Sequence, residues 1–188
     1  MRRRIFIAIN FPENIKKRLY EYQKKWIDLP CRWTKKENIH ITLAFLGYLT
    51  EEELLKAIDI TKEVTLRHGP FSINLIKILY GPPKKPPRMV WIEGEESEEL
   101  GKLQMDLENS FKGLQYKKEA RPYAPHITLG RLREWEFRRI EPEEKPEINE
   151  KISLNFFVES IEVMESELKK TGPEYTILES VSLSEKIT

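Results

Sequence analysis

The sequence predicts an α+β fold of two similar lobes, related by a pseudo-twofold axis, with mainly antiparallel sheets, flanking helices and an active-site cleft between the lobes. The first observation behind this prediction is an internal repeat, because the tetrapeptide His-Ile-Thr-Leu begins at His40 and again at His126. The second is that a strand-like and then a helix-like segment precede each copy. A period of about 86 residues is too long for a solenoid unit, so we expect one bilobal domain over residues 1–188.

Apolar patterning defines the elements of the first half. Residues 3–9 are apolar and rich in β-branched side chains, which predicts a strand. Residues 12–28 carry apolar or aromatic side chains every three to four positions, which predicts an amphipathic helix with a lysine-rich outer face. A strand over 38–46, a helix over 50–68 that begins with a capping box, and a strand over 71–80 complete this half.

The second half repeats the order strand, helix, strand after a proline-rich loop and then ends in further strands. Its predicted elements are a loop over 81–87, strands over 89–92 and 127–132, a helix over 97–111, an exposed acidic loop over 134–149, and strands over 152–164 and 175–183.

Composition narrows the function classes. The net charge of +1 argues against a large basic surface, so any contact with RNA must come from local clusters and involve a small target such as an end. Cys31 is the single cysteine, so no intramolecular disulfide can form, which suits a cytoplasmic location. The N-terminal apolar run is too short for a signal peptide, and no segment predicts a membrane span. We expect a cytoplasmic monomer that needs no membrane and no obligate protein partner.

The repeated tetrapeptide predicts a site because side chains alternate across a strand. His40 and Thr42 therefore share one face, and the intervening apolar residues point into the core. The same alternation holds for His126 and Thr128. If a pseudo-twofold axis relates the lobes, two imidazoles and two hydroxyls converge on the cleft.

That set of groups suits displacement at a phosphodiester. One imidazole can accept a proton from the attacking oxygen while the other donates one to the leaving oxygen, because the ordinary pKa of histidine is about 6.5. Threonine hydroxyls can donate to the non-bridging oxygens, and the Arg131 guanidinium can grip phosphate. Gly130 is expected to let the strand bulge and to aim Arg131. Zinc is a weaker alternative, since no third ligand accompanies the two histidines. The third histidine, His68, is expected to be an ordinary surface residue.

Basic and aromatic residues flank both motifs. Trp33 precedes the first and Tyr123 the second, and Arg88 lies near the proline-rich loop with Lys84 and Lys85. Such residues either stack on unpaired bases and bind phosphates or form core edges and solvated surface. Trp33, Tyr123 and Arg88 are thus candidate substrate-binding residues. Cys31 is not expected to be a nucleophile, because no helix start or histidine lies near it in the sequence.

Taken together, these residues resemble a known family. Segments 32–47 and 121–131, with the opening strand over 4–9, the segment Arg88-Met-Val-Trp91 and the ending over 166–175, resemble the two-histidine phosphoesterase superfamily. The similarity is greatest to its bacterial and archaeal RNA 2′,3′-cyclic phosphodiesterase branch, also called 2′-5′ RNA ligase. The resemblance covers nearly the whole chain. One departure is Ala44, at a position where many relatives carry a basic residue, so a basic phosphate contact from that position is expected to be absent here.

The resemblance implies that the protein hydrolyses an RNA 2′,3′-cyclic phosphate, or a small cyclic nucleotide, to a 2′-phosphate without metal or other cofactor. It implies that His40 is the proton donor and His126 the proton acceptor. It also implies that Thr42 and Thr128 bind the phosphate and that Arg131 supports it.

Two alternatives remain open at the level of sequence. A 2′-5′ RNA ligase acting on tRNA-half ends would use the same histidines in the reverse direction. An RNA-binding or tRNA-processing protein with incidental catalysis is the other, although both motifs are intact and the net charge is low.

Overall fold

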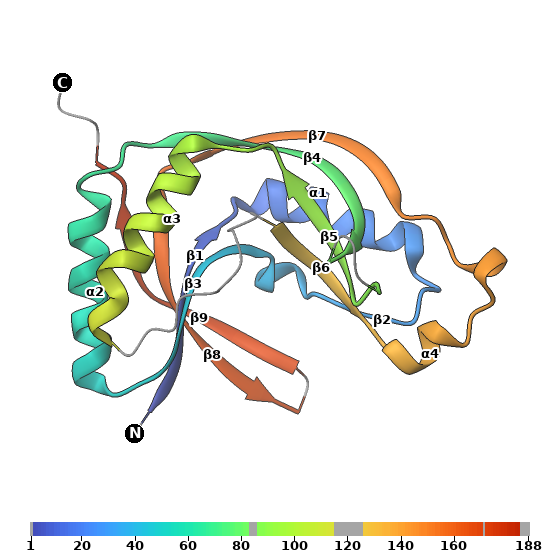
Figure 1. The fold of residues 1–188 in the computed structure, drawn as a ribbon, viewed down its shortest axis with the longest axis horizontal. Coiled ribbons are helices and arrows are strands. Elements are labelled where there is room, and N and C mark those ends of the chain that lie inside the picture. The colour runs from blue at the N-terminus through green and yellow to red at the C-terminus, as the bar shows by residue number, and fades with distance from the viewer. Residues whose placement is uncertain (1, 83–85, 115–125, 171, 185–188) are drawn as a thin grey trace.

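The computed structural model of the chain describes residues 2–82, 86–114, 126–170 and 172–184, and it has an α+β fold built on two antiparallel sheets (Figure 1). The first sheet has the strand order β3-β1-β8-β9 and the second the order β2-β6-β5-β4-β7. The strands are β1 (Arg3–Asn10), β2 (Cys31–Trp33), β3 (His40–Leu49), β4 (Phe71–Gly81), β5 (Met89–Gly94), β6 (His126–Leu132), β7 (Asn149–Val158), β8 (Ser160–Lys169) and β9 (Gly172–Ser182). The helices are α1 (Glu13–Gln23), α2 (Glu51–Thr65), α3 (Glu98–Ser110) and α4 (Glu134–Arg138), with 3₁₀ turns η1 (Lys24–Trp26), η2 (Lys36–Asn38), η3 (Phe111–Leu114) and η4 (Pro142–Glu144).

The two halves of the sequence exchange elements between the sheets. Strand β4 from the first half pairs with β5 and β7 in the second sheet, and β8 from the second half pairs with β1 in the first sheet. Helix α1 contacts β6, whereas α3 packs beside α2 and against β3, as Figure 1 shows. The predicted pair of mainly antiparallel sheets is confirmed, but the sequence repeat does not mark the boundary between the lobes.

Several element boundaries differ from the predictions for identifiable reasons. The predicted helix over 12–28 ends at Gln23 and continues as a 3₁₀ turn. The predicted loop over 134–149 contains α4, because Phe137 buries its ring against Tyr80 with the two centroids 5.5 Å apart. The predicted strand over 152–164 is two strands, β7 and β8, which break at Glu159 so that each joins a different sheet.

The predicted capping box at the start of α2 is present. The Thr50 hydroxyl accepts from the Glu53 backbone N–H at 3.3 Å, and the Glu53 carboxylate accepts from the Thr50 N–H at 2.8 Å. None of the described helices is long and apolar enough to cross a membrane.

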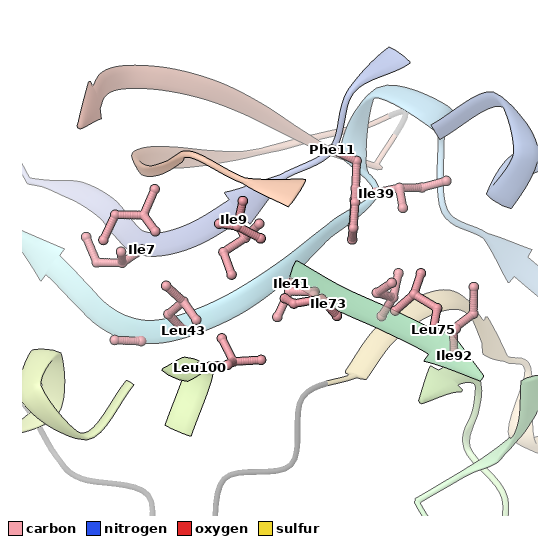
Figure 2. Close-up of a cluster of buried hydrophobic side chains, with 14 of the residues drawn as sticks. Ile7, Ile9, Phe11, Ile39, Ile41, Leu43, Ile73, Leu75, Ile92 and Leu100 are labelled. Carbon is pink, nitrogen blue, oxygen red and sulfur yellow. The ribbon is translucent and has the colours of Figure 1, made fainter. Parts of the chain in front are cut away.

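A continuous apolar core joins the two sheets and fixes the first motif in place. Ile41 and Leu43 are 1% and 3% exposed and pack with residues of β1, β4, β5 and α3 (Figure 2). Truncating a buried Ile or Leu to Ala typically costs about 2–5 kcal/mol. A slip of β3 by one residue would turn both side chains toward solvent, so the core sets the face on which His40 and Thr42 lie.

Candidate active site

The first motif lies on β3, which carries a bulge after its threonine. Ile7 and Ala8 of β1 pair with Ala44 and Thr42, so Leu43 is the extra residue. A bulge shifts the side-chain alternation by one position. Consequently Leu43 and Ala44 are both buried, and the next residue to point outward is Phe45, which is 52% exposed. A residue at position 44 faces the core, so the departure noted at Ala44 does not remove a group from the site.

The second motif, on β6, repeats this backbone device. Val90 and Trp91 of β5 pair with Gly130 and Thr128, which makes Leu129 the extra residue. The predicted irregularity is therefore present one residue before Gly130, and Arg131 is the outward residue equivalent to Phe45. Gly130 serves a different purpose, because a Cβ there would lie 2.4 Å from Cys31 Sγ. The glycine lets β2 approach β6.

Both motifs line one cavity of about 630 Å³ between the two sheets. Each motif contributes its histidine, its threonine and its third outward residue. Among the described lining residues, five carry a positive charge and none carries a carboxylate, in a chain whose net charge is only +1. The remaining lining residues include aromatic groups and the tip of the β8–β9 hairpin. The full lining is Arg32, Trp33, Thr34, Lys35, Asn38, His40, Thr42, Phe45, His126, Thr128, Arg131, Leu168, Lys169, Lys170, Gly172, Pro173 and Tyr175.

His40 is oriented by a backbone carbonyl and enclosed by aromatic rings. Its Nδ1 lies 2.7 Å from the Asn38 carbonyl oxygen, and because a carbonyl can only accept, Nδ1 carries the proton. Nε2 then faces Thr42 Oγ1 at 3.0 Å. The rings of Phe6 and Tyr175 lie with centroids 5.1 Å and 5.2 Å from the imidazole. Desolvation lowers the pKa of His40 to about 4, with smaller contributions from the Lys16 and His126 charges, while the hydrogen bond to the Asn38 carbonyl acts in the opposite direction. This imidazole is therefore neutral near pH 7 in the free protein.

The surroundings of His126 are different. Its ring stacks on the indole of Trp91, with centroids 4.0 Å apart and planes 25° apart. Next to this pair, the thioether of Met89 is 3.4 Å from Arg131 Nη1 and 4.0 Å from Thr128 Oγ1. Residues of β5 thus contact all three outward side chains of the second motif.

Thr34 and the buried amide of Gln23 hold the backbone of the second motif through hydrogen bonds to its carbonyl oxygens. The Thr34 hydroxyl donates to the Thr128 carbonyl oxygen at 2.8 Å, and its N–H donates to the Leu129 carbonyl oxygen at 2.8 Å. Gln23 is 3% exposed, and its amide donates to the carbonyl oxygens of Thr34 and Leu129 at 2.8 Å and 3.1 Å. Gln23 is not among the residues predicted from the sequence, although a polar residue four positions after Leu19 on the apolar face of a helix is a usable signal.

The other predicted candidates have varied positions. Trp33 lines the cavity, but Arg88 is not among its described lining residues, and its guanidinium Nε lies 3.7 Å from Glu134. Tyr123, with Lys84 and Lys85, lies outside the described residues. Elsewhere in the fold, the predicted surface residue His68 pairs with Asp106 at 2.8 Å.

Two further groups bear on the chemistry. Burial raises the pKa of the Cys31 thiol to about 12, and a thiol in that state is a poor nucleophile, in line with the prediction. Within the ranges that the structure describes, no three His, Cys, Asp or Glu side chains gather where they could hold a metal ion.

Comparison with known proteins places this geometry among phosphoesterases. A family model described as LigT like Phosphoesterase matches the chain twice, over residues 9–91 and 92–175. A Methanocaldococcus jannaschii protein named RNA 2′,3′-cyclic phosphodiesterase is 30% identical over 180 residues, covering 93% of this chain and 98% of the relative. The crystal structure of TT0787 from Thermus thermophilus has a TM-score of 0.82 and 29% identity, covering 96% of this chain and 97% of that one. Escherichia coli LigT complexed with 3′-AMP, at 22% identity, shares the fold with a TM-score of 0.81 over 98% of this chain and 100% of that one.

Proposed function

The chain belongs to the LigT-like phosphoesterase family, and we propose that it hydrolyses RNA ends that carry a 2′,3′-cyclic phosphate to 2′-phosphomonoesters. The observation that carries this proposal is the convergence of both His-x-Thr motifs on one cavity whose described lining has five cations and no carboxylate. A relative 30% identical over nearly its whole length is named for this activity. A phosphate that enters the cavity meets two imidazoles, two hydroxyls and a guanidinium.

The proposed reaction is an in-line displacement in which one histidine acts on each side of phosphorus. Water attacks phosphorus while one imidazole takes its proton, and the bond from phosphorus to the ribose 3′ oxygen breaks as the other imidazole protonates that oxygen. The 2′ oxygen keeps the phosphate. The hydroxyls of Thr42 and Thr128 and the Arg131 guanidinium donate to the non-bridging oxygens. No step requires a metal ion.

The proposed roles of the two histidines rest on the resemblance and on a proton taken up with the substrate. The resemblance implies that His40 is the donor, yet its pKa of about 4 leaves it neutral in the free protein. A bound phosphate anion raises the pKa of a neighbouring imidazole. We therefore propose that His40 takes up a proton as the anion binds and then donates it to the leaving oxygen. The reverse assignment, in which neutral His40 accepts from water, is the competing one.

One incubation tests the function and its nearest alternative. A short RNA with a 2′,3′-cyclic phosphate end is incubated with the protein, with and without a 5′-hydroxyl RNA and with excess chelator, and the product is analysed by phosphorus NMR. A 2′-phosphate formed in the presence of chelator supports the proposal. A joined strand would favour the ligase, and a 3′-phosphate or no product would contradict hydrolysis as proposed. Running 2′,3′-cyclic AMP in parallel shows whether a mononucleotide is enough.

A second experiment assigns the histidine roles. A cyclic-phosphate analogue whose leaving group needs no proton should restore activity to the variant that lacks the donor. Rescue of His40→Ala alone supports the donor role of His40, and rescue of His126→Ala alone shows that the roles are reversed.

A further inference from the structure

The second histidine lies flat on a tryptophan that comes from a neighbouring strand. Trp91 and Thr128 are paired residues of β5 and β6, and the indole extends across to the ring of His126, with centroids 4.0 Å apart. In the first sheet, the residue paired with the equivalent Thr42 is Ala8. The stack is therefore not part of the duplicated pattern, because it belongs to the second motif alone.

The indole also contacts β4, which lies on the other side of β5 from β6, and the Met89 side chain. A Cβ added at Gly81 of the adjacent strand β4 would lie 2.2 Å from Trp91 Cδ2, so the indole packs directly against this glycine. At the edge, Trp91 Nε1 lies 3.4 Å from Met89 Sδ. That sulfur is also 3.4 Å from Arg131 Nη1. The Met89 sulfur therefore contacts both the tryptophan and the arginine and links their positions.

We propose that Trp91 is a positioning residue for the proton transfer by His126, an inference that rests on the proposed function. A histidine side chain can turn about two torsions, and only some ring orientations point a nitrogen at the reacting oxygen. Stacking on an immobilised indole restricts the imidazole plane to a narrow range. Gly81 allows the indole to take this position, because any side chain at residue 81 would occupy the space of the indole.

The proposal predicts a loss of turnover rather than of binding. A displacement of about 1 Å in a catalytic group can lower the rate about 100-fold. Trp91→Leu should therefore lower kcat by about 10- to 100-fold and change KM by less than about 3-fold. Trp91→Phe keeps an aromatic face and should retain most of the activity. Trp135→Leu is the matched control, since that indole is 73% exposed on α4, and it should match the wild-type rate.

A double-mutant cycle separates positioning from general damage to the fold. With His126→Ala as the background, Trp91→Leu has no imidazole left to hold, so it should cost less than about 2-fold in kcat. If Trp91→Leu lowers kcat by the same factor in His126→Ala as in wild type, its effect does not depend on His126 and the positioning role is wrong.

Gly81→Ala approaches the same arrangement from the other side. The new methyl group should displace the indole and reproduce the kcat loss of Trp91→Leu, whereas the double variant Gly81→Ala/Trp91→Leu should be no slower than Trp91→Leu alone. A wild-type kcat in Gly81→Ala would overturn the proposal that contact with Gly81 positions the Trp91 indole.

A spectroscopic measurement keeps this inference distinct from the proposed function. The chain has three histidines, so their imidazole protons can be assigned in NMR spectra with His→Gln variants. The His126 protons should show a ring-current displacement that Trp91→Leu removes and Trp135→Leu leaves in place. If the displacement is present but the wild-type protein does not hydrolyse the cyclic phosphate, the function fails. If hydrolysis is present but Trp91→Leu turns over at the wild-type rate, the positioning role fails.

Discussion

His40 and His126 occupy equivalent places on β3 and β6, but the first is enclosed by aromatic rings at tilted and edge-on angles whereas the second lies on the face of an indole. The backbone around them is the same, with an extra residue after each threonine that turns a third side chain outward. That third side chain is Phe45 in one motif and Arg131 in the other. The duplicated backbone thus fixes which positions face the cavity, while the side chains around them give the two imidazoles different environments.

Because the motifs differ, the two sides of the cavity present different chemical groups. On the first side, an apolar ring stands beside a half-buried imidazole whose pKa is lowered. On the second side, a guanidinium stands beside a stacked imidazole. In the proposed reaction both threonines donate to the non-bridging oxygens, but only the second motif adds a charged donor, the Arg131 guanidinium. The comparison predicts which substitutions should be costly.

The largest effect should come from removing either imidazole. His40→Ala and His126→Ala should each lower kcat on an RNA cyclic phosphate by about 10²- to 10⁴-fold, the usual contribution of one positioned acid or base. The double variant should lose much less than the product of the single losses, because the two groups act together. His68→Ala is the matched control, since this histidine pairs with Asp106 elsewhere in the fold. Full activity in both single variants would end the catalytic interpretation of the motifs.

The lowered pKa of His40 should also appear as a pH dependence of stability. The pKa is about 4 in the folded protein and about 6.5 in the unfolded chain. Between these values the unfolded chain binds a proton that the folded protein does not, so stability is full above about pH 6.5 and falls as the pH drops toward 4. The loss should be at most about 3 kcal/mol, since one pH unit corresponds to about 1.36 kcal/mol.

Urea unfolding at a series of pH values measures this contribution. Carboxylates elsewhere in the chain titrate in the same range, so the useful quantity is the difference between wild type and His40→Gln. The free energy of unfolding of wild type minus that of His40→Gln should fall as the pH drops from about 6.5 to about 4. A constant difference would mean that the folded and unfolded states protonate His40 alike, and the contrast between the two histidines would lose its electrostatic basis.

The next largest difference should be between variants of the third outward residue of each motif, Arg131 and Phe45. Arg131→Ala removes a charged donor, whose hydrogen bond typically contributes about 1.5–3 kcal/mol, so kcat/KM should fall by about 10- to 100-fold. Phe45→Ala removes an apolar ring from the equivalent position and should cost less than about 5-fold. The measurement is kcat/KM for both variants on the same RNA. Equal losses would show that the cavity is not divided in the way that the side chains indicate.

The paired motifs show what a sequence can specify and what it leaves open. Alternation along a strand is enough to place His40, Thr42, His126 and Thr128 on exposed faces, because the apolar residues between them have to be buried. The strand exchange between halves is not predictable, since one pattern of strands and helices fits either pairing. The contact between Trp91 and His126 depends on the register of β5 against β6 and on a bulge, and neither leaves a local signal.

Arg88 illustrates a different limit of the sequence. Its position before β5 suggests a phosphate contact, but its guanidinium lies 3.7 Å from Glu134 of α4. The sequence predicts an exposed loop where α4 lies, so it offers no partner for Arg88. Electrostatic pairing between distant segments depends on the tertiary fold, and composition alone cannot assign it.

The smallest effects should come from the two hydroxyls, and they offer the finest test of the comparison. Thr42 Oγ1 already lies 3.0 Å from His40 Nε2, so it has to exchange that partner for a phosphate oxygen. Thr128 Oγ1 instead lies 4.0 Å from the Met89 thioether sulfur, which is a weak acceptor and is easily given up. A neutral hydrogen bond contributes about 0.5–1.5 kcal/mol, so Thr→Val at either site should lower kcat by roughly 2- to 12-fold, with the larger loss at Thr128. Thr→Ser keeps the hydroxyl and should stay within about 2-fold of wild type at both sites. If Ser and Val variants lose the same activity, the methyl group and its packing matter rather than the donor, and if Thr42→Val is the more damaging, its hydroxyl serves His40 as well as the phosphate.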